Sequence, residues 1–215
     1  MKIFIPIKEN SQRVPRKNFR LINEAPLYKH VLYKLTDFEV YVDTDSHKIV
    51  EGIATDSKLQ NVTVYEREKN LIGDEVSVCD LIDNFIRSQK IQDEHICQLH
   101  VTSPFVTTQM LKGAFDKLKE GYDSIVSCNK IQSRLWREET YGFAPINHNP
   151  IKLEQTQDLP TYYEENSIFY IFDVEQFLKT KMRVGFNPFF YTVDFPHNID
   201  IDTEDDWELV ERMTS

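Results

Sequence analysis

The feature that most constrains this chain is a strongly basic loop directly after its first apolar segment. Ile3, Ile5 and Ile7 alternate through a strand-like run. The loop behind it carries five cations against the single acid Glu9: Lys8, Arg13, Arg16, Lys17 and Arg20. The whole chain is acidic, with 25 Lys and Arg residues, 35 Asp and Glu residues and a net charge of −10. A basic loop after a strand is typical of phosphate sites in α/β proteins, so we expect an anion here; a solvated charged surface is the alternative. Nothing matches the Walker pattern GxxxxGK[ST].

Length and composition indicate one main domain over residues 1–215, because 215 residues with 40% hydrophobic content can bury one substantial core. The three cysteines, Cys79, Cys97 and Cys128, are far apart and odd in number, so we expect reduced, mostly buried thiols. The acidity argues against a nucleic-acid partner. No apolar run approaches the roughly 20 residues that span a bilayer, and the start lacks a leader pattern. We therefore expect a soluble, cytoplasmic protein without a membrane partner.

Short apolar runs alternate with helical patterns over the first 127 residues. This alternation predicts an α/β fold in which a mostly parallel sheet is covered by helices on both faces. The predicted strands lie near 2–7, 38–42, 61–65, 95–99 and 122–127. The predicted helices lie near 26–36, 46–55, 75–89 and 107–120.

The alternation stops near Cys128, and residues 129–160 show aromatic residues and prolines without a clear period. We interpret this stretch as an arm or insertion that covers a cleft or reaches a second subunit; a plain long loop is the alternative. The regular pattern then returns with a strand at Ser167–Phe172, a helix near 173–180, a strand near 189–193 and a last helix from Thr203.

Two acidic pairs stand beside strand-like segments. Asp200 and Asp202 project from the same face of an extended chain, which suits one Mg²⁺ ion; capping and turn formation are the alternative. Thr203 is expected to cap the last helix, with Glu204, Asp205 and Asp206 in its positive first turn. Asp43-Thr44-Asp45 ends a strand where α/β sheets gather ligand groups, so Asp43 is a candidate ligand contact. Asp45 or Ser46 is expected to cap the next helix, and a nucleotide contact is the alternative for Asp45.

Six segments, in order, make the chain resemble the acylneuraminate cytidylyltransferase family. They are Ile5–Asn18 for IPARGGSKGIPRKN, Val42–Ser46 for STD, Arg67 with Asp74–Ser77 for the R…D…S region, Thr102–Phe105 for QPTSPLR, Glu165-Asn166 with Tyr170 for NGAIY, and Asp200–Asp205 for DIDTPED. The resemblance implies a three-layer, Rossmann-like nucleotidyltransferase fold. It also implies a homodimer, in which residues 129–165 form a protruding arm and Arg134 and Trp136 lie at the subunit contact.

The resemblance further implies that CTP and a sugar acid react to give a CMP-sugar and pyrophosphate. The implied catalytic residues are Lys8, Arg13 and Lys17. The implied nucleotide-binding residues are Ile7, Lys8, Ser11, Arg13, Lys17, Asn18, Asp43, Arg67 and Ser77. The implied sugar-binding residues are His100, Thr102, Ser103, Asn166 and Tyr170, and the implied Mg²⁺ ligands are Asp200 and Asp202.

The chain departs from the family pattern on both sides of the expected site. Glu9-Asn10 replaces paired glycines, Gln12 replaces a lysine and Arg13 replaces a glycine in the loop. His100, Val106 and Ser167 replace glutamine, arginine and glycine on the sugar side. We therefore expect the acceptor to be a sialic, legionaminic, pseudaminic or related acid, and not necessarily N-acetylneuraminate. The alternatives are a non-catalytic nucleotide-binding protein and a glycosyltransferase using Asp43-Thr44-Asp45 as its metal motif. No general base is evident, and His197 is more simply a structural residue.

Overall fold

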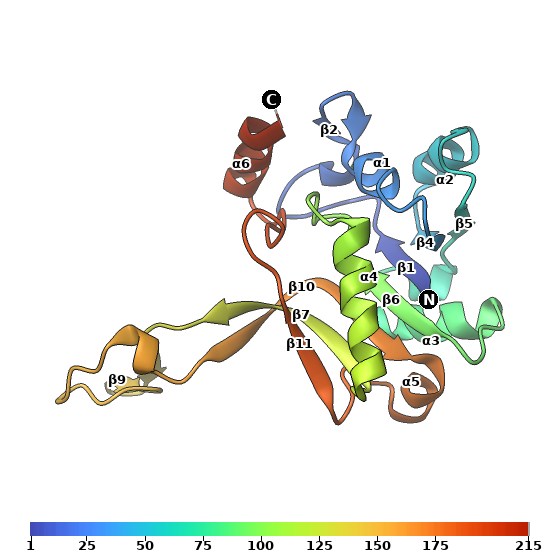
Figure 1. The fold of residues 1–215 in the computed structure, drawn as a ribbon. Helices are drawn as coiled ribbons and strands as arrows, with labels where there is room; N and C mark the ends of the chain where they lie inside the picture. Colours follow the sequence, from blue (N-terminus) through green and yellow to red (C-terminus); the bar gives the residue numbers. More distant parts are fainter. Residues whose placement is uncertain (215) are drawn as a thin grey trace.

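A seven-stranded sheet forms the centre of the protein in a computed structural model that describes residues 1–214 (Figure 1). The strand order is β11-β7-β10-β6-β1-β4-β5. The strands are β1 (Lys2–Ile7), β4 (Glu39–Thr44), β5 (Val62–Glu66), β6 (His95–Leu99), β7 (Ser124–Ile131), β10 (Tyr162–Asp173) and β11 (Pro188–Thr192). Only β10 runs antiparallel to its neighbours in this sheet of the described chain. The predicted α/β fold with a mostly parallel sheet is confirmed.

Side-chain alternation along the central strand separates two buried layers. Ile3, Ile5 and Ile7 pack with α1 (Leu27–Leu32), α2 (His47–Ala54) and α4 (Thr108–Asp116). Phe4 points to the other face and packs with α3 (Val78–Ser88) and α5 (Val174–Thr180). Because successive residues of a strand face opposite sides, one strand supplies both cores. The result is three layers, helix on sheet on helix.

A third, smaller core joins the two ends of the chain. Trp207 and Val210 of α6 (Glu204–Thr214) pack with Val14 of the basic loop and with Ile22. Ile22 belongs to the short hairpin of β2 (Leu21–Ile22) and β3 (Ala25–Pro26). Figure 1 shows α6 beside this hairpin. Burial of these apolar side chains therefore fixes the C-terminal segment against the basic loop.

Four helices, α3 to α6, begin at a side-chain cap. Thr203 caps α6, because its Oγ1 accepts a hydrogen bond from the Asp206 N–H at 3.2 Å. The predicted cap of α2 by Asp45 or Ser46 is wrong, because Ser46 is the N-cap residue but makes no side-chain cap hydrogen bond and Asp45 accepts the Glu9 N–H. Two helices are also shorter than predicted. The predicted helix at 26–36 is α1 over only six residues, and the one at 107–120 ends as α4 at Asp116 and continues as the 3-10 helix η3 (Lys117–Glu120). The remaining 3-10 turns are η1 (Lys17–Phe19), η2 (Lys69–Leu71) and η4 (Thr156–Asp158).

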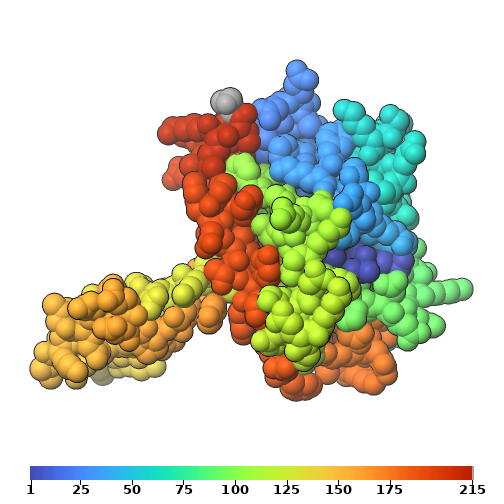
Figure 2. All heavy atoms as spheres, in the orientation of Figure 1, coloured from blue at the N-terminus to red at the C-terminus, as the bar shows by residue number. Residues whose placement is uncertain are grey.

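An arm projects from the body where β7 and β10 run on as an antiparallel ribbon (Figures 1 and 2). The ribbon pairs Glu165 with Cys128 and Tyr162 with Ile131. Beyond it lies a hairpin of β8 (Trp136–Glu139) and β9 (Gly142–Pro145). The sequence shows no period here because all four β8 residues are exposed, so no apolar alternation marks the strand.

No helix within residues 1–214 is long and apolar enough to cross a membrane. The three cysteines are free; Cys97 and Cys128 are buried and Cys79 is half-buried.

Candidate active site

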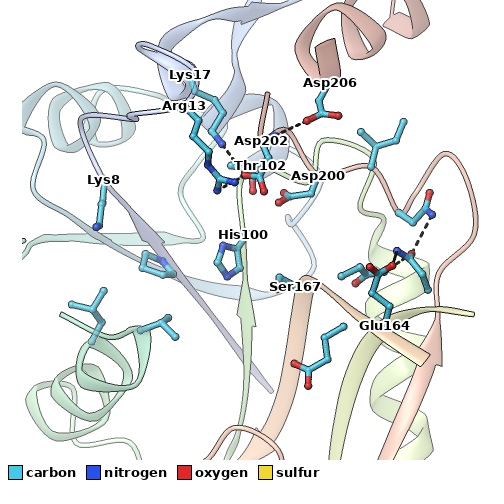
Figure 3. A pocket seen from close by; sticks show the side chains of 18 of the residues that line it. Lys8, Arg13, Lys17, His100, Thr102, Glu164, Ser167, Asp200, Asp202 and Asp206 are labelled. Atoms are coloured by element: carbon cyan, nitrogen blue, oxygen red, sulfur yellow. Dashed lines mark hydrogen bonds and ion pairs between the residues drawn. The ribbon is translucent and has the colours of Figure 1, made fainter. Parts of the chain in front are cut away.

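One large cavity, about 890 Å³ in volume, opens at the carboxyl ends of the central strands. The basic loop, the end of β6, the base of the arm and the segment before α6 line it. Figure 3 shows Lys8 and Glu164 at opposite ends, with His100, Lys17, Asp200 and Asp202 between them. This is the edge at which α/β sheets bind ligands.

The basic loop meets the C-terminal carboxylates inside this cavity. Lys17 Nζ lies 3.8 Å from Asp202 Oδ1, and its side chain is 8% exposed. The same ammonium donates to the backbone carbonyl of Ile201, 184 residues further along the chain. Arg13 Nη2 lies 2.7 Å from Asp202 Oδ1. The site predicted from the two ends of the sequence therefore lies in one crevice, and burial lowers the pKa of Lys17.

Hydrogen bonds to neighbouring segments fix the path of the loop. The Asn18 amide donates to the Lys8 carbonyl at 2.8 Å, which closes the loop on itself. The Glu9 N–H donates to Asp45 Oδ1 at 2.6 Å, so Asp45 holds the loop from outside. Lys8 Nζ lies 3.2 Å from Asp74 Oδ1, and the Lys8 side chain is still half exposed to solvent. Lys8, Arg13 and Lys17 thus keep their cationic groups along one wall of the cavity.

Asp200 and Asp202 offer a hard anionic donor set that fits Mg²⁺. Both line the cavity, and burial raises the pKa of the Asp200 carboxyl above its usual range. Ser103 Oγ donates to Asp200 Oδ1 at 3.3 Å, and a hydrogen bond from the Thr102 side chain also acts on the Asp200 carboxylate. Within residues 1–214 no group of three or more His, Cys, Asp or Glu side chains gathers as a metal site, so the remaining ligands of an ion here would come from substrate and water. Asp206, as expected, serves the helix end, because its carboxylate accepts the Asp202 and Thr203 N–H groups.

One end of the cavity is apolar and carries a single fixed guanidinium. Val76, Val78 and Leu81 line it together with Pro6. Arg67 also lines it, with its Nε 2.7 Å from Asp43 Oδ1 and a side chain that is 1% exposed. A flat apolar surface beside fixed hydrogen-bond donors suits a nucleobase.

The other end is polar and carries no cation among its described lining residues. Asn129 Oδ1 accepts hydrogen bonds from the amides of Asn166 and Asn198, each at 3.2 Å. Asn129 in turn donates to Glu164 Oε2 at 3.1 Å, and Tyr170 Oη donates to Glu165 Oε2 at 2.7 Å. Such a wall of amides and carboxylates suits a polyhydroxylated ligand.

The polar wall depends on an irregularity in β10. The pairing with β7 shifts between Glu165 and Tyr170, and Ser167 there has a φ of 58°. This left-handed conformation stands where the family pattern has glycine, the residue that adopts it at no steric cost. The bulge allows Glu165, Asn166 and Ser167 all to line the cavity.

His100 lies between the two ends as a neutral side chain. Burial, reinforced by the nearby charge of Arg183, lowers its pKa to about 4. It therefore offers one hydrogen-bond donor and one acceptor at neutral pH and no positive charge. Thr102 lines the cavity beside it.

Seven of the predicted site residues do not line this cavity. Ile7 and Asn18 are buried behind the loop, and Asp43 is buried behind Arg67. Ser11 is half-buried in the loop outside the lining set. Ser103 lies outside the lining set, and its hydroxyl donates a hydrogen bond to Asp200 Oδ1.

The other two of these residues, Ser77 and Tyr170, make contacts elsewhere in the structure. Ser77 is the N-cap of α3 and forms a capping box with Asp80, so its hydroxyl is occupied there. Tyr170 is 2% exposed and packs in the second core, where it reaches the cavity only through Glu165. The spacing Ser-x-x-Asp at 77–80 is a capping signal visible in the sequence.

Four residues that line the polar end are not among the predicted site residues: Asn129, Glu164, Glu165 and Asn198. Their signal in the sequence is weak, because it depends on where the β7–β10 ribbon leaves the sheet. Val76, Val78 and Leu81 are not predicted to line a cavity, because in the sequence they are typical of the first turn of an amphipathic helix.

Comparison with known proteins shows the family of the chain. A family model described as cytidylyltransferase matches residues 3–214. The CMP-N,N'-diacetyllegionaminic acid synthase of Legionella pneumophila subsp. pneumophila is 28% identical over 226 residues, covering 97% of this chain and 94% of that protein. A pseudaminic acid cytidylyltransferase of Campylobacter jejuni subsp. jejuni is 25% identical over 223 residues, with 97% and 94% covered.

Solved structures share the fold along the whole chain. CMP:2-keto-3-deoxy-manno-octonic acid synthetase complexed with CTP has a TM-score of 0.65 at 16% identity, covering 98% of this chain and 96% of that chain. A 4-diphosphocytidyl-2C-methyl-D-erythritol synthase has a TM-score of 0.67 at 11% identity, covering 100% and 98%. The predicted fold and the predicted nucleotidyltransferase activity are both confirmed, and the chain belongs to the cytidylyltransferase family.

Proposed function

We propose that this cytidylyltransferase activates a nine-carbon keto sugar acid, such as sialic, legionaminic, pseudaminic or a related acid, with CTP. The products are the CMP-sugar and pyrophosphate. The observation that carries the proposal is the meeting of Lys17 and Arg13 with Asp202 in one cavity. The names of the relatives, which include a legionaminic acid synthase and a pseudaminic acid cytidylyltransferase, support this substrate class.

In the proposed reaction an oxygen–phosphorus bond forms as the anomeric hydroxyl of the sugar acid attacks the α-phosphorus of CTP. The bond between the α-phosphorus and the bridging oxygen breaks, pyrophosphate leaves and the hydroxyl proton passes to solvent. Negative charge moves onto the leaving pyrophosphate. Lys8, Arg13 and Lys17 would bind the phosphates and neutralise this charge.

Asp200 and Asp202 would hold Mg²⁺, which supplies Lewis-acid charge neutralisation at phosphate oxygens when it is bound. Ser103 orients Asp200 by its hydrogen bond at 3.3 Å. The Asp202 side chain is 40% exposed and faces the cavity, so it can turn from the exposed Arg13 guanidinium toward a cation.

The two ends of the cavity support one orientation of the substrates. The base would lie against Val76, Val78 and Leu81 beside Arg67, and the sugar acid would lie against Asn129, Glu164, Glu165 and Asn166. The phosphates between them would meet Lys17 and Arg13. In this orientation Ser11, Ser77 and Tyr170 have no direct contact with substrate.

The arm supports a homodimer. Its apolar side chains are strongly exposed, with Tyr141 at 100%, Ile151 at 95%, Leu153 at 86% and Phe143 at 69%. Trp136 is also half exposed, whereas Arg134 is tied to the Glu154 carbonyl inside the arm. We propose that residues 1–215 form one domain whose arm, at about 129–165, packs on a second copy. Because CTP is a cytosolic nucleotide, the proposed site of action is the cytoplasm.

Two alternatives have less support from the geometry. A glycosyltransferase metal motif at Asp43-Thr44-Asp45 needs two accessible carboxylates. Asp43 is fully buried against Arg67, and Asp45 accepts the Glu9 N–H. A non-catalytic protein has no need for paired carboxylates beside the cationic loop.

The test is pyrophosphate release from CTP and Mg²⁺ with a panel of sialic, legionaminic, pseudaminic and octulosonic acids. We expect release with at least one nine-carbon acid. Lys17→Met should abolish tight CTP binding, whereas the control Lys112→Met, on the exposed face of α4, should leave it unchanged. Release with no acid would contradict the proposal, and unaltered CTP affinity in Lys17→Met would contradict the assignment of the loop.

A further inference from the structure

Asp43 and Arg67 form a buried ion pair at the apolar end of the cavity, where Arg67 is a lining residue and Asp43 lies behind it. Arg67 Nε donates to Asp43 Oδ1 at 2.7 Å, and the two side chains are 1% and 0% exposed. Arg67 Nη2 also points to the carbonyls of Asp43 and Ile7, at 3.3 and 3.5 Å. The Arg67 N–H donates to the Thr44 carbonyl at 2.7 Å, which ties the start of the side chain to β4. The guanidinium is therefore held from three directions.

The pair is an inefficient way to stabilise the fold. Asp43 Oδ2 is buried without a hydrogen-bond partner, and so is the Oη of Tyr65, which stands opposite Asp43 in the β4–β5 register. Burial raises the pKa of Asp43, so its charged form is poorly solvated despite Arg67. Buried ion pairs with unsatisfied oxygens generally contribute little net stability. What this pair does provide is a fixed orientation of Arg67.

That orientation leaves one part of Arg67 for a ligand. Of the five N–H groups of a guanidinium, those on Nε and Nη2 are turned toward Asp43 and Ile7. Within residues 1–214, the hydrogen bonds of the Arg67 side chain use Nε and Nη2 and not Nη1, and Arg67 lines the cavity. The Nη1 group is thus a fixed pair of donors. Cytosine offers two adjacent acceptors, N3 and O2, whereas uracil carries a donor at N3.

We propose that Asp43 is a positioning residue that sets the selectivity for CTP over UTP by fixing Arg67. The inference rests on the proposed function, because it takes the base to lie beside Arg67. Asp43 itself does not touch the nucleotide. Asp43→Ser, which removes the carboxylate and keeps a small polar side chain, gives a second way to test this role.

The experiment is a double-mutant cycle of Asp43→Asn and Arg67→Met, with kcat/KM measured for CTP and for UTP. We expect Asp43→Asn to lower the CTP/UTP ratio about tenfold, mainly through KM for CTP, without a change in KM for the sugar acid. Arg67→Met should lower the ratio at least as much. In the Arg67→Met background, Asp43→Asn should have no further effect, because it acts only through Arg67. Asp37→Asn, an exposed acid, is the matched control.

Three results would overturn the inference: an unchanged ratio in Asp43→Asn, an equal drop in both backgrounds, or a change in sugar-acid KM alone. A purely structural role would lower the unfolding temperature but leave the CTP/UTP ratio intact. If Asp43→Asn does not fold, Asp43→Ser takes its place in the cycle. Failure of the proposed function itself is distinct, because the wild-type protein would then release no pyrophosphate from CTP; calorimetric CTP and UTP affinities would still test the positioning role.

Discussion

The two ends of the cavity are built differently. At the nucleotide end, Lys17, Arg67 and Asp43 are buried and held by backbone carbonyls or by each other. At the sugar end, Glu164 and Glu165 are exposed and hydrogen-bond only to neighbouring side chains within the described structure. In the proposed reaction the nucleotide is a constant substrate and the sugar acid is the variable one across relatives. The nucleotide end is therefore built from buried residues of the core, whereas the sugar end lies on the β7–β10 ribbon outside the core.

The largest effect is expected from a change in the Asp200–Asp202 pair, which lies beside the cations of the nucleotide end. Asp202→Asn should lower kcat about 100-fold or more, because one of two proposed Mg²⁺ ligands loses its charge. The measurement is the steady-state rate over a range of Mg²⁺ concentrations. Asp205→Asn, an exposed acid three residues further on, should retain the wild-type rate. Equal rates for the two variants would contradict the metal assignment.

The pH dependence of CTP binding tests the burial of Lys17. Burial lowers its pKa, and only the charged form attracts triphosphate, so CTP affinity should fall as pH rises and do so below the usual lysine value of about 10.4. Lys17→Arg stays charged at all accessible pH values and should move this alkaline limb upward. Calorimetric titration with CTP between pH 7 and 10 measures this shift. If the wild type and Lys17→Arg lose affinity for CTP at the same pH, Lys17 does not set the pH dependence.

A smaller effect is expected at the sugar end. Glu165→Gln should raise KM for the sugar acid about tenfold, because a charge-assisted acceptor is lost, while KM for CTP stays constant. Initial rates with each substrate varied in turn separate the two. Glu175→Gln, on the exposed face of α5, is the matched control. A change in KM for CTP would contradict the claim that the two ends of the cavity bind their substrates independently.

The smallest effect concerns the bulge that carries the polar wall. Ser167→Gly should stabilise the fold by about 0.5–1 kcal/mol, because glycine adopts the left-handed φ of 58° at no steric cost. Denaturant midpoints measure the difference. Ser167→Ala removes the same hydroxyl and keeps the strain, so it separates the two contributions. A destabilised Ser167→Gly alongside a neutral Ser167→Ala would contradict the strain argument.

The difference between the two ends also explains what the sequence could predict. Lys17, Arg13, Asp200 and Asp202 were identified because charges beside apolar strands have few structural uses. Their meeting could not be predicted from local pattern, since it depends on Val14 packing against Trp207. The central sheet could be predicted from the sequence, because buried strands and helices leave a strong hydrophobic period.

The parts that were missed lie where burial is low. The β8–β9 hairpin consists largely of exposed residues, so no period marks it. Glu164 and Glu165 reach the cavity because of the shift in pairing after Glu165, which sequence spacing does not encode. Tyr170, which the resemblance predicts at the sugar, packs in the second core with Phe172 because of the alternation along β10. An aromatic residue next to a motif is therefore a weaker indicator of a ligand than a charge is.

The central claim is that triphosphate is held between the N-terminal basic loop and the Asp200–Asp202 pair. The most direct test is a crystal structure of the protein with CTP and Mg²⁺. The account predicts the ion between both carboxylates and phosphate oxygens, with Lys17 in contact with the same phosphates and the base beside Arg67. An ion bound away from Asp200 and Asp202, or phosphates outside the reach of Lys17, would contradict it.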